Sequence, residues 1–273
     1  MSSYGYRPGT IPTAIKNLLI INIIVYFGFE VLGNSFAISP SHMFGLHLFE
    51  SDYFRPWQII THMFMHGSFY HLFGNMFALF MFGRILEQVW GTKRFLIFYF
   101  VCGLGAALIH TFVLWIDYHS MNAAFTAFKN TPDPSLLSNF LSDHIGHANS
   151  WVYEFIDSWK ANPDSVQYIE QGKMIFEKVI TESVDVPTVG ASGAIFGVLV
   201  GFGVLFPNTE LLLLFPPIPI KAKYVIGVYI IFELFMAMQN SAGDDVAHFA
   251  HLGGAIIGYL LITYWRRNRK NFY

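Results

Sequence analysis

The groups in this sequence that are best suited to catalysis are one serine and several histidines, all placed in apolar stretches. Ser192 stands between Gly190 and Gly193 at the start of an apolar run that ends near residue 206. His251 lies near the start of the last apolar run. A serine hydroxyl becomes a nucleophile when a base takes its proton, and histidine titrates near neutral pH. Ser192 and His251 are therefore predicted to act as a nucleophile and its general base.

Hydrogen-bond donors for this chemistry are predicted on another segment. The tetrahedral intermediate of acyl transfer carries a negative oxygen that needs donors. His71 and Asn75 are four residues apart, so they project from the same side of a helix. Their imidazole and amide N–H groups, together with the backbone N–H of Ser192, are expected to stabilise the oxyanion.

His251 is predicted to be the base in preference to His248. The two histidines are three residues apart and cannot both fill one role. His251 shares a helix side with Gly254 and Gly258, where small residues let another helix approach closely, while His248 lies nearer to water. No carboxylate is evident as an orienting partner for His251, and Glu233 receives no role.

The composition indicates that these groups lie in a membrane. The chain has 273 residues, of which 54% are hydrophobic and 12% charged. Soluble domains carry about 25% charged residues, so an integral membrane protein is predicted. The net charge of −2 decides little by itself, and the absence of a basic stripe argues against a nucleic-acid partner. The single cysteine, Cys102, excludes an internal disulfide framework.

Six apolar runs are candidates for membrane spans, each of which needs about 20 apolar residues. A polar stretch, 117–187, separates the third run from the short fourth one, and its spacing predicts amphipathic helices outside the lipid. The predicted fold is an all-α polytopic membrane protein of six spanning helices, with a long extracytoplasmic insertion between helices 3 and 4. The expected spans are residues 15–33, 58–83, 95–116, 188–206, 223–240 and 246–265.

The basic residues predict how the spans are oriented. Eleven of the sixteen Lys and Arg residues fall at one set of span ends or in the two terminal segments, and such residues favour the cytoplasmic side. Both termini are thus expected in the cytoplasm, with a bacterial plasma membrane as the location. The predicted division is a cytoplasmic segment 1–14, a membrane domain 15–265 that includes the insertion, and a basic tail 266–273.

These motifs resemble those of the rhomboid family of intramembrane serine proteases. The resemblance covers all six spans and rests on "GASG" around Ser192, "AHLGGAIIG" from Ala250, "HMFMHGSFYHLFGNM" and "GRILEQVWGTKRF". It implies a six-helix bundle with a Ser192–His251 dyad, oxyanion support from His71 and Asn75, and cleavage of transmembrane protein substrates within the lipid bilayer. It also implies supporting roles for His66, Gly190, Gly193, Gly254 and Glu87.

The sequence departs from the family in two places. Trp57-Gln58 stands where the family often has Trp-Arg, so the charged anchor of the first loop is either missing or replaced by Arg55. The 117–187 insertion is longer than a minimal bacterial member needs. The sequence indicates neither the natural substrate nor the oligomeric state.

Two other functions stay open. One is a metal or haem oxidoreductase built on His62, His66, His71, His248 and His251, because the first two have a spacing that can hold one ion on a helix. Against it, no H-E-x-x-H motif occurs, carboxylates are absent at that depth, and His66 and His71 would point about 140° apart on one helix. The other is a non-catalytic relative that binds membrane proteins, although such relatives usually lose the serine or histidine. No metal and no cofactor are therefore predicted.

Overall fold

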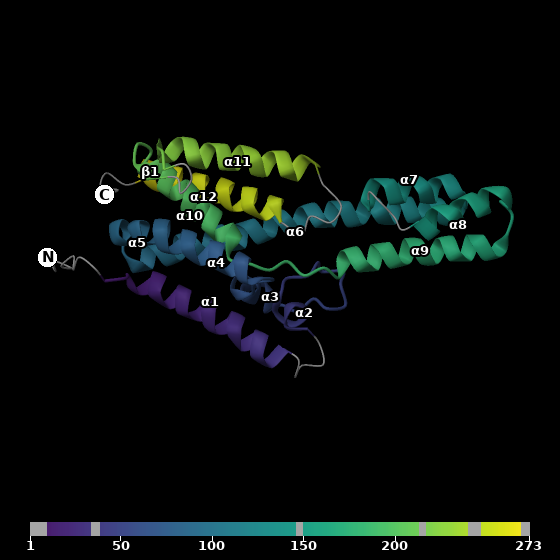
Figure 1. Ribbon diagram of the computed structural model, residues 1–273, viewed down its shortest axis with the longest axis horizontal. Helices are drawn as coiled ribbons and strands as arrows, with labels where there is room; N and C mark the ends of the chain where they lie inside the picture. The colour runs from purple at the N-terminus through teal and green to yellow at the C-terminus, as the bar shows by residue number, and fades with distance from the viewer. Residues whose placement is uncertain (1–9, 34–38, 146–149, 213–216, 240–246, 269–273) are drawn as a thin grey trace.

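The apolar runs fold into helices in the computed structural model, which describes residues 10–33, 39–145, 150–212, 217–239 and 247–268 (Figure 1). An all-α membrane fold is thereby confirmed, apart from one short hairpin in which β1 (Glu210–Leu212) pairs antiparallel with β2 (Pro219–Lys221). The apolar segments correspond to α1 (Thr13–Leu32), α4 (Phe69–Ala78) with its continuation η3 (Leu79–Gly83) and α5 (Arg84–Trp90), α6 (Thr92–Asn130), α10 (Ser192–Leu205), α11 (Ala222–Gln239) and α12 (His248–Asn268).

Four stretches of these helices are long and apolar enough to cross a membrane: 13–31, 69–90, 92–130 and 222–239. The apolar helix α10 has 14 residues and spans about 21 Å at 1.5 Å per residue, less than a hydrocarbon core of about 30 Å. Helix α12 is not among the four. The count of six spans therefore stays a prediction.

Helix α10 lies at the centre of the bundle. Twelve of its fourteen residues are buried, and it packs against α6 and α12. Glycine makes the contact with α12 possible, because a Cβ added to Gly254 would come within 1.8 Å of the carbonyl oxygen of Gly193. One turn further on, a Cβ on Gly258 would lie 2.9 Å from the Cα of Gly197. The face with Gly254 and Gly258, which was expected to let another helix approach closely, does so.

The predicted span 58–83 is wrong as a single helix. Residues Gln58–Thr61 form the short α3 and His62–Phe64 form one 3₁₀ turn, η2. Met65 is then extended, and α4 begins only at Phe69. The break is stabilised by Ser68, whose hydroxyl accepts a hydrogen bond from the backbone N–H of His71 at 3.2 Å. His62 and His66 therefore precede α4 instead of sharing one continuous helix with His71.

Helix α6 continues into the polar stretch 117–187 without a break at residue 117. Helix α6 runs on to Asn130 and is followed by α7 (Pro134–His144), α8 (Ser150–Ala161) and α9 (Val166–Val184). The buried side chains form a second core that includes Phe128, Trp159 and Phe176, each 0% exposed. On α8 the buried residues are four and three positions apart, so the expectation of amphipathic helices is confirmed. Their position outside the lipid stays a prediction.

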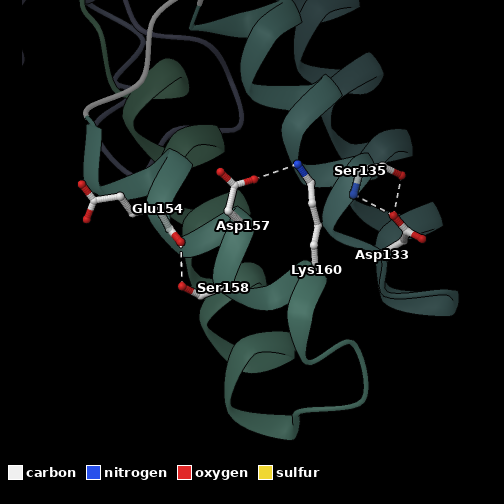
Figure 2. Close-up of polar contacts among 6 residues, drawn as sticks. All are labelled: Asp133, Ser135, Glu154, Asp157, Ser158 and Lys160. Atoms are coloured by element: carbon white, nitrogen blue, oxygen red, sulfur yellow. Dashed lines mark hydrogen bonds and ion pairs between the residues drawn. The ribbon is translucent and has the colours of Figure 1, made fainter.

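The outward faces of these helices carry ordinary surface contacts (Figure 2). Asp133 is the N-cap residue just before α7 and accepts hydrogen bonds from the hydroxyl and the backbone N–H of Ser135, which lower the pKa of its carboxyl below the ordinary value. Lys160 pairs with Asp157 at 2.9 Å on α8. Such exposed ion pairs contribute about 0–1 kcal/mol, so the buried aromatic core holds this region together.

The described ends of the chain lie at the same end of the bundle. Helix α1 begins and α12 ends there, while α7, α8 and α9 gather around the far part of α6 (Figure 1). This arrangement agrees with termini on one side of the membrane and the insertion on the other. Most of segment 1–14 and of tail 266–273 lies outside the described residues, so those boundaries stay predictions.

Candidate active site

Ser192 is the first residue of α10 and is 9% exposed. The segment before it is held by a bridge between Leu46 and Thr188 and by a hydrogen bond of 2.9 Å from the N–H of Gly190 to the carbonyl of His62. The first N–H groups of a helix have no intrahelical acceptor, and this end of the helix favours negative charge. The backbone around Ser192 therefore offers donors for an oxyanion.

The imidazole of His71 lies close to Ser192. A Cβ built on Gly190 would stand 2.8 Å from Cε1 and 2.9 Å from Nε2 of His71, and 3.4 Å from Oγ of Ser192. Both side chains thus flank the same backbone position. Asn75, one turn further along α4, is 8% exposed, and its Nδ2 has no hydrogen-bond partner among the described residues. This buried N–H donor is free to meet a developing negative charge.

The position of His66 differs from the expectation. A continuous helix would have turned His66 and His71 apart, but the extended Met65 brings their ring centroids to 5.1 Å in an edge-on contact. Both ring nitrogens of His66 are buried and lack a hydrogen-bond partner within the part of the chain that the structure describes. The ring of His66 therefore packs edge-on against the ring of His71 and restricts its rotation.

His251 approaches the site from α12. Its ring stacks on Phe196 of α10, with the centroids 4.3 Å apart and the planes at 11°. The ring is 8% exposed and lies near enough to His71 for the two to interact electrostatically. No hydrogen bond joins His251 to the hydroxyl of Ser192 in the described residues. Catalytic hydrogen bonds are often long in the absence of substrate and tighten in the complex.

A carboxylate that received no role from the sequence lies next to His251. Glu233 of α11 is 3% exposed, and its Oε2 lies 2.9 Å from Nδ1 of His251 and 2.6 Å from Nδ1 of His248. The expectation that no carboxylate is a partner of His251 is therefore wrong. The signal was present, because an ionisable residue within an apolar span is a candidate functional residue by default. Sequence spacing alone did not show that α11 turns Glu233 toward α12.

His110 is a second polar group near the site that sequence reasoning missed. It lies on α6, its Nδ1 is buried without a hydrogen-bond partner in the described ranges, and it interacts electrostatically with His251 and His62.

Glu87 does not contact Ser192, and its hydrogen bonds stabilise the start of α1. Its carboxylate, 2% exposed, accepts hydrogen bonds from the backbone N–H groups of Ala14 at 2.8 Å and Ile15 at 2.9 Å. It also accepts one from the Thr92 hydroxyl at 2.7 Å. Pro12, the residue before α1, makes no side-chain cap, so Glu87 supplies the acceptor that the helix start requires.

Gln58 organises the loop between α1 and α4. It is 0% exposed, donates from Nε2 to the carbonyl of Tyr53 at 2.9 Å, and accepts from the N–H of Arg55 at 3.0 Å. The guanidinium of Arg55 is exposed and donates hydrogen bonds to the nearby carbonyls of Asp52 and Phe54. Within this loop the buried anchor is therefore the neutral amide of Gln58, and replacement of the charged anchor by Arg55 stays a prediction.

The residues that could ligate a metal ion differ from the set of histidines considered from the sequence. Within the described ranges, the one group of three His, Cys, Asp or Glu donors close enough to hold an ion is Glu233, His248 and His251, whose ligand atoms lie within 4.8 Å of one another. His62, His66 and His71 do not join it. The expectation that carboxylates are absent at this depth is wrong, because Glu233 is there.

Known proteins are similar to this chain over most of its length. Residues 53–121 and 168–268 match the rhomboid domain family, and segment 122–167 lies between the two matched stretches. Rhomboid protease AarA of Providencia stuartii is 26% identical over 254 residues, which are 89% of this chain and 69% of that protein. Rhomboid protein 1, mitochondrial, of Saccharomyces cerevisiae is 26% identical over 249 residues, 89% of this chain and 50% of its own length. Inactive RHOMBOID-like protein 8 of Arabidopsis thaliana is 33% identical over 108 residues, 36% of this chain and 30% of that protein.

Proposed function

The chain belongs to the rhomboid family, and from this membership we propose that it is a serine endopeptidase that cleaves transmembrane proteins within the bilayer, with Ser192 as nucleophile and His251 as general base. One observation carries the assignment: Ser192 begins a buried helix beside the imidazole of His71, and the ring of His251 stacks on Phe196, four residues further along the same helix. The similarity to a protein named rhomboid protease supports it.

The proposed reaction follows from the free nitrogen of His251. Its Nδ1 is engaged by Glu233, so Nε2 is the atom that takes the proton of Ser192 as Oγ attacks the peptide carbonyl carbon. The carbonyl oxygen becomes an oxyanion, which in this proposal the Ser192 N–H, His71 and Asn75 stabilise. The carbon–nitrogen bond then breaks, and His251 returns the proton to the leaving amine. A water molecule hydrolyses the ester by the reverse use of the same groups.

The buried location of Ser192 determines what a substrate must do. A peptide carbonyl within a membrane helix is hydrogen-bonded and shielded, so the substrate helix has to unwind locally before Oγ can attack. Small, helix-destabilising residues in the outer part of a substrate are expected to help. Replacing Gly by Leu in that part should lower its cleavage, and unchanged cleavage would contradict this requirement.

The proposed location is a bacterial plasma membrane with both termini in the cytoplasm, which puts Ser192 near the outer face. The same orientation places α7, α8 and α9 outside the cell. Partners are then the lipid bilayer and transmembrane protein substrates, and the reaction as proposed uses no cofactor.

The test is cleavage of a model transmembrane substrate by the purified chain in detergent, with Ser192→Ala and His251→Ala as matched variants. We expect both variants to lose cleavage, and a fluorophosphonate probe to label the native chain but not Ser192→Ala. His248→Ala tests the choice of base, and loss of activity there with full activity in His251→Ala would reverse it. A native chain that cuts nothing and takes no label, yet binds membrane proteins, would instead match the non-catalytic alternative, since one similar protein is named as inactive.

A further inference from the structure

Glu233 connects two helices through a single oxygen atom. Oε2 is within hydrogen-bond distance of Nδ1 on both His248 and His251, which lie one helical turn apart on α12. All three side chains are buried, with exposures of 3%, 9% and 8%. A carboxylate without partners would not be stable at such a place, so two N–H donors to one oxygen are what allow it to stay ionised.

The hydrogen bond to Glu233 also decides where the His251 proton resides. A neutral imidazole has one N–H, and an ionised carboxylate can only accept. The proton of His251 therefore sits on Nδ1, and Nε2 keeps the lone pair that a general base requires. Without the carboxylate, the stack on Phe196 would not fix this tautomer, because that contact is compatible with a proton on either nitrogen.

The same hydrogen bond makes the orientation of the His251 ring depend on how α11 packs against the bundle. Glu233 is one of four buried residues on α11, whereas Val228, Ile231 and Phe235 of that helix are 67%, 67% and 56% exposed. Most of α11 thus faces outward and touches the bundle along a narrow strip. A shift of α11 away from α12 would withdraw the carboxylate from His251.

We propose that Glu233 is a positioning residue that holds His251 in the tautomer with a free Nε2 and makes this tautomer conditional on the contact between α11 and α12. The inference rests on the proposed function, since it concerns the same base. His248 is the second donor to the carboxylate in this arrangement and does not itself take the serine proton.

The experiment compares Glu233→Gln with the native chain in the cleavage assay. Glutamine has nearly the same shape but is neutral and presents one acceptor oxygen, so we expect kcat to fall by roughly 10²-fold while KM changes little. His248→Gln should lower kcat much less, because Glu233 still accepts from His251. Glu30→Gln is the control for removing an acid from an apolar helix, because Glu30 is exposed on α1, and we expect native kcat from it.

A second measurement does not depend on how well the Glu233 variant folds. Nitrogen-15 NMR of histidine in the folded Ser192→Ala chain reports the tautomer of His251 directly, and we expect the Nδ1–H form. A dominant Nε2–H form would overturn the proposal.

The controls separate the possible failures. Native kcat in Glu233→Gln, with no cleavage by Ser192→Ala, would overturn the role of Glu233 and leave the proposed function intact. Full cleavage by Ser192→Ala would overturn the proposed function itself. Loss of activity on chelation, with recovery on adding Zn²⁺, would show that Glu233, His248 and His251 bind a metal and that positioning is the wrong role.

Discussion

Gly190 sets the geometry beside Ser192 at the scale of a single residue. Its φ of +130° is a conformation that side chains with a Cβ rarely adopt, and the space where a Cβ would stand is taken by His71. Two requirements thus meet at one position: the backbone must turn sharply before α10, and the imidazole must lie against it. Glycine satisfies both.

We expect Gly190→Ala to lower kcat/KM by roughly 10²-fold, because the methyl group would displace His71 from the side of Ser192. The backbone strain should also lower the free energy of unfolding by about 1–3 kcal/mol. Cleavage assays and denaturant unfolding in detergent measure the two effects. Gly28→Ala is the control, since a Cβ there meets nothing within 4 Å. Equal activity of both variants with the native chain would show that His71 does not depend on Gly190.

Residue types predicted much of the candidate site but not its connections. Ser192, His251 and His71 stood out because polar groups within apolar spans are costly. Glu233 was equally visible in the sequence, yet its role depends on how α11 is rotated against α12. That rotation results from packing between helices, which a single sequence does not specify, so a buried acid without a known neighbour could not be assigned.

At the scale of elements, the start of α1 depends on a residue 72 positions away. The carboxylate of Glu87 accepts hydrogen bonds from the first backbone N–H groups of α1 and from the hydroxyl of Thr92, the first residue of α6. One carboxylate thus stabilises the starts of two helices. Glu87 is far from Ser192, the proposed nucleophile, so we expect it to contribute to the stability of the fold and not to catalysis.

Glu87→Gln is expected to lower the free energy of unfolding by about 1.5–3 kcal/mol, because an ionised acceptor of three hydrogen bonds becomes a neutral amide. Thr92→Val removes one of the three donors and should cost about 1 kcal/mol. Unfolding in a denaturing detergent titration tests both. Fluorophosphonate labelling of Ser192 in the fraction that stays folded should be unchanged, and a loss of labelling without a loss of stability would contradict this separation.

Helix existence was easier to predict than helix ends. Long apolar runs indicated α1, α6 and α11 because burial in a bilayer requires internal hydrogen bonding. The break before α4 was missed because its apolar and histidine residues continue the pattern, while a side-chain cap at Ser68 and an extended Met65 interrupt the backbone. The continuation of α6 beyond residue 116 was missed because the shift from apolar to polar residues was taken as the end of the helix. Such a shift marks where a helix passes from lipid to water, and the helix itself can continue beyond that point.

At the scale of the whole molecule, two cores lie in one chain. One contains α10 and the helices around it, and the other contains α7, α8, α9 and the far part of α6. The loop before α3 is joined to the second core, since Leu48 belongs to that core and Ser51 donates a hydrogen bond at 2.6 Å to Asp185, which follows α9.

Trp159→Ala is expected to remove about 3–5 kcal/mol from the second core and leave the first one folded, because the two are packed separately. Hydrogen exchange should rise across residues 121–184 and stay low in 192–205. Trp151→Ala is the control on the same helix, where the side chain is 55% exposed. Equal loss of protection in both regions would mean that the chain unfolds as one cooperative unit.

The length of α6 has a consequence for what can reach Ser192. Its 39 residues extend about 58 Å, whereas a hydrocarbon core is about 30 Å thick. If α6 crosses the bilayer, nearly half of it stands above the outer surface and carries α7, α8 and α9 with it (Figure 1). A protein whose folded domain sits directly on the membrane would collide with this projection, whereas one on a slender stalk would pass beside it. Under the proposed function, we therefore expect the projection to favour substrates whose outer domains stand clear of the membrane surface.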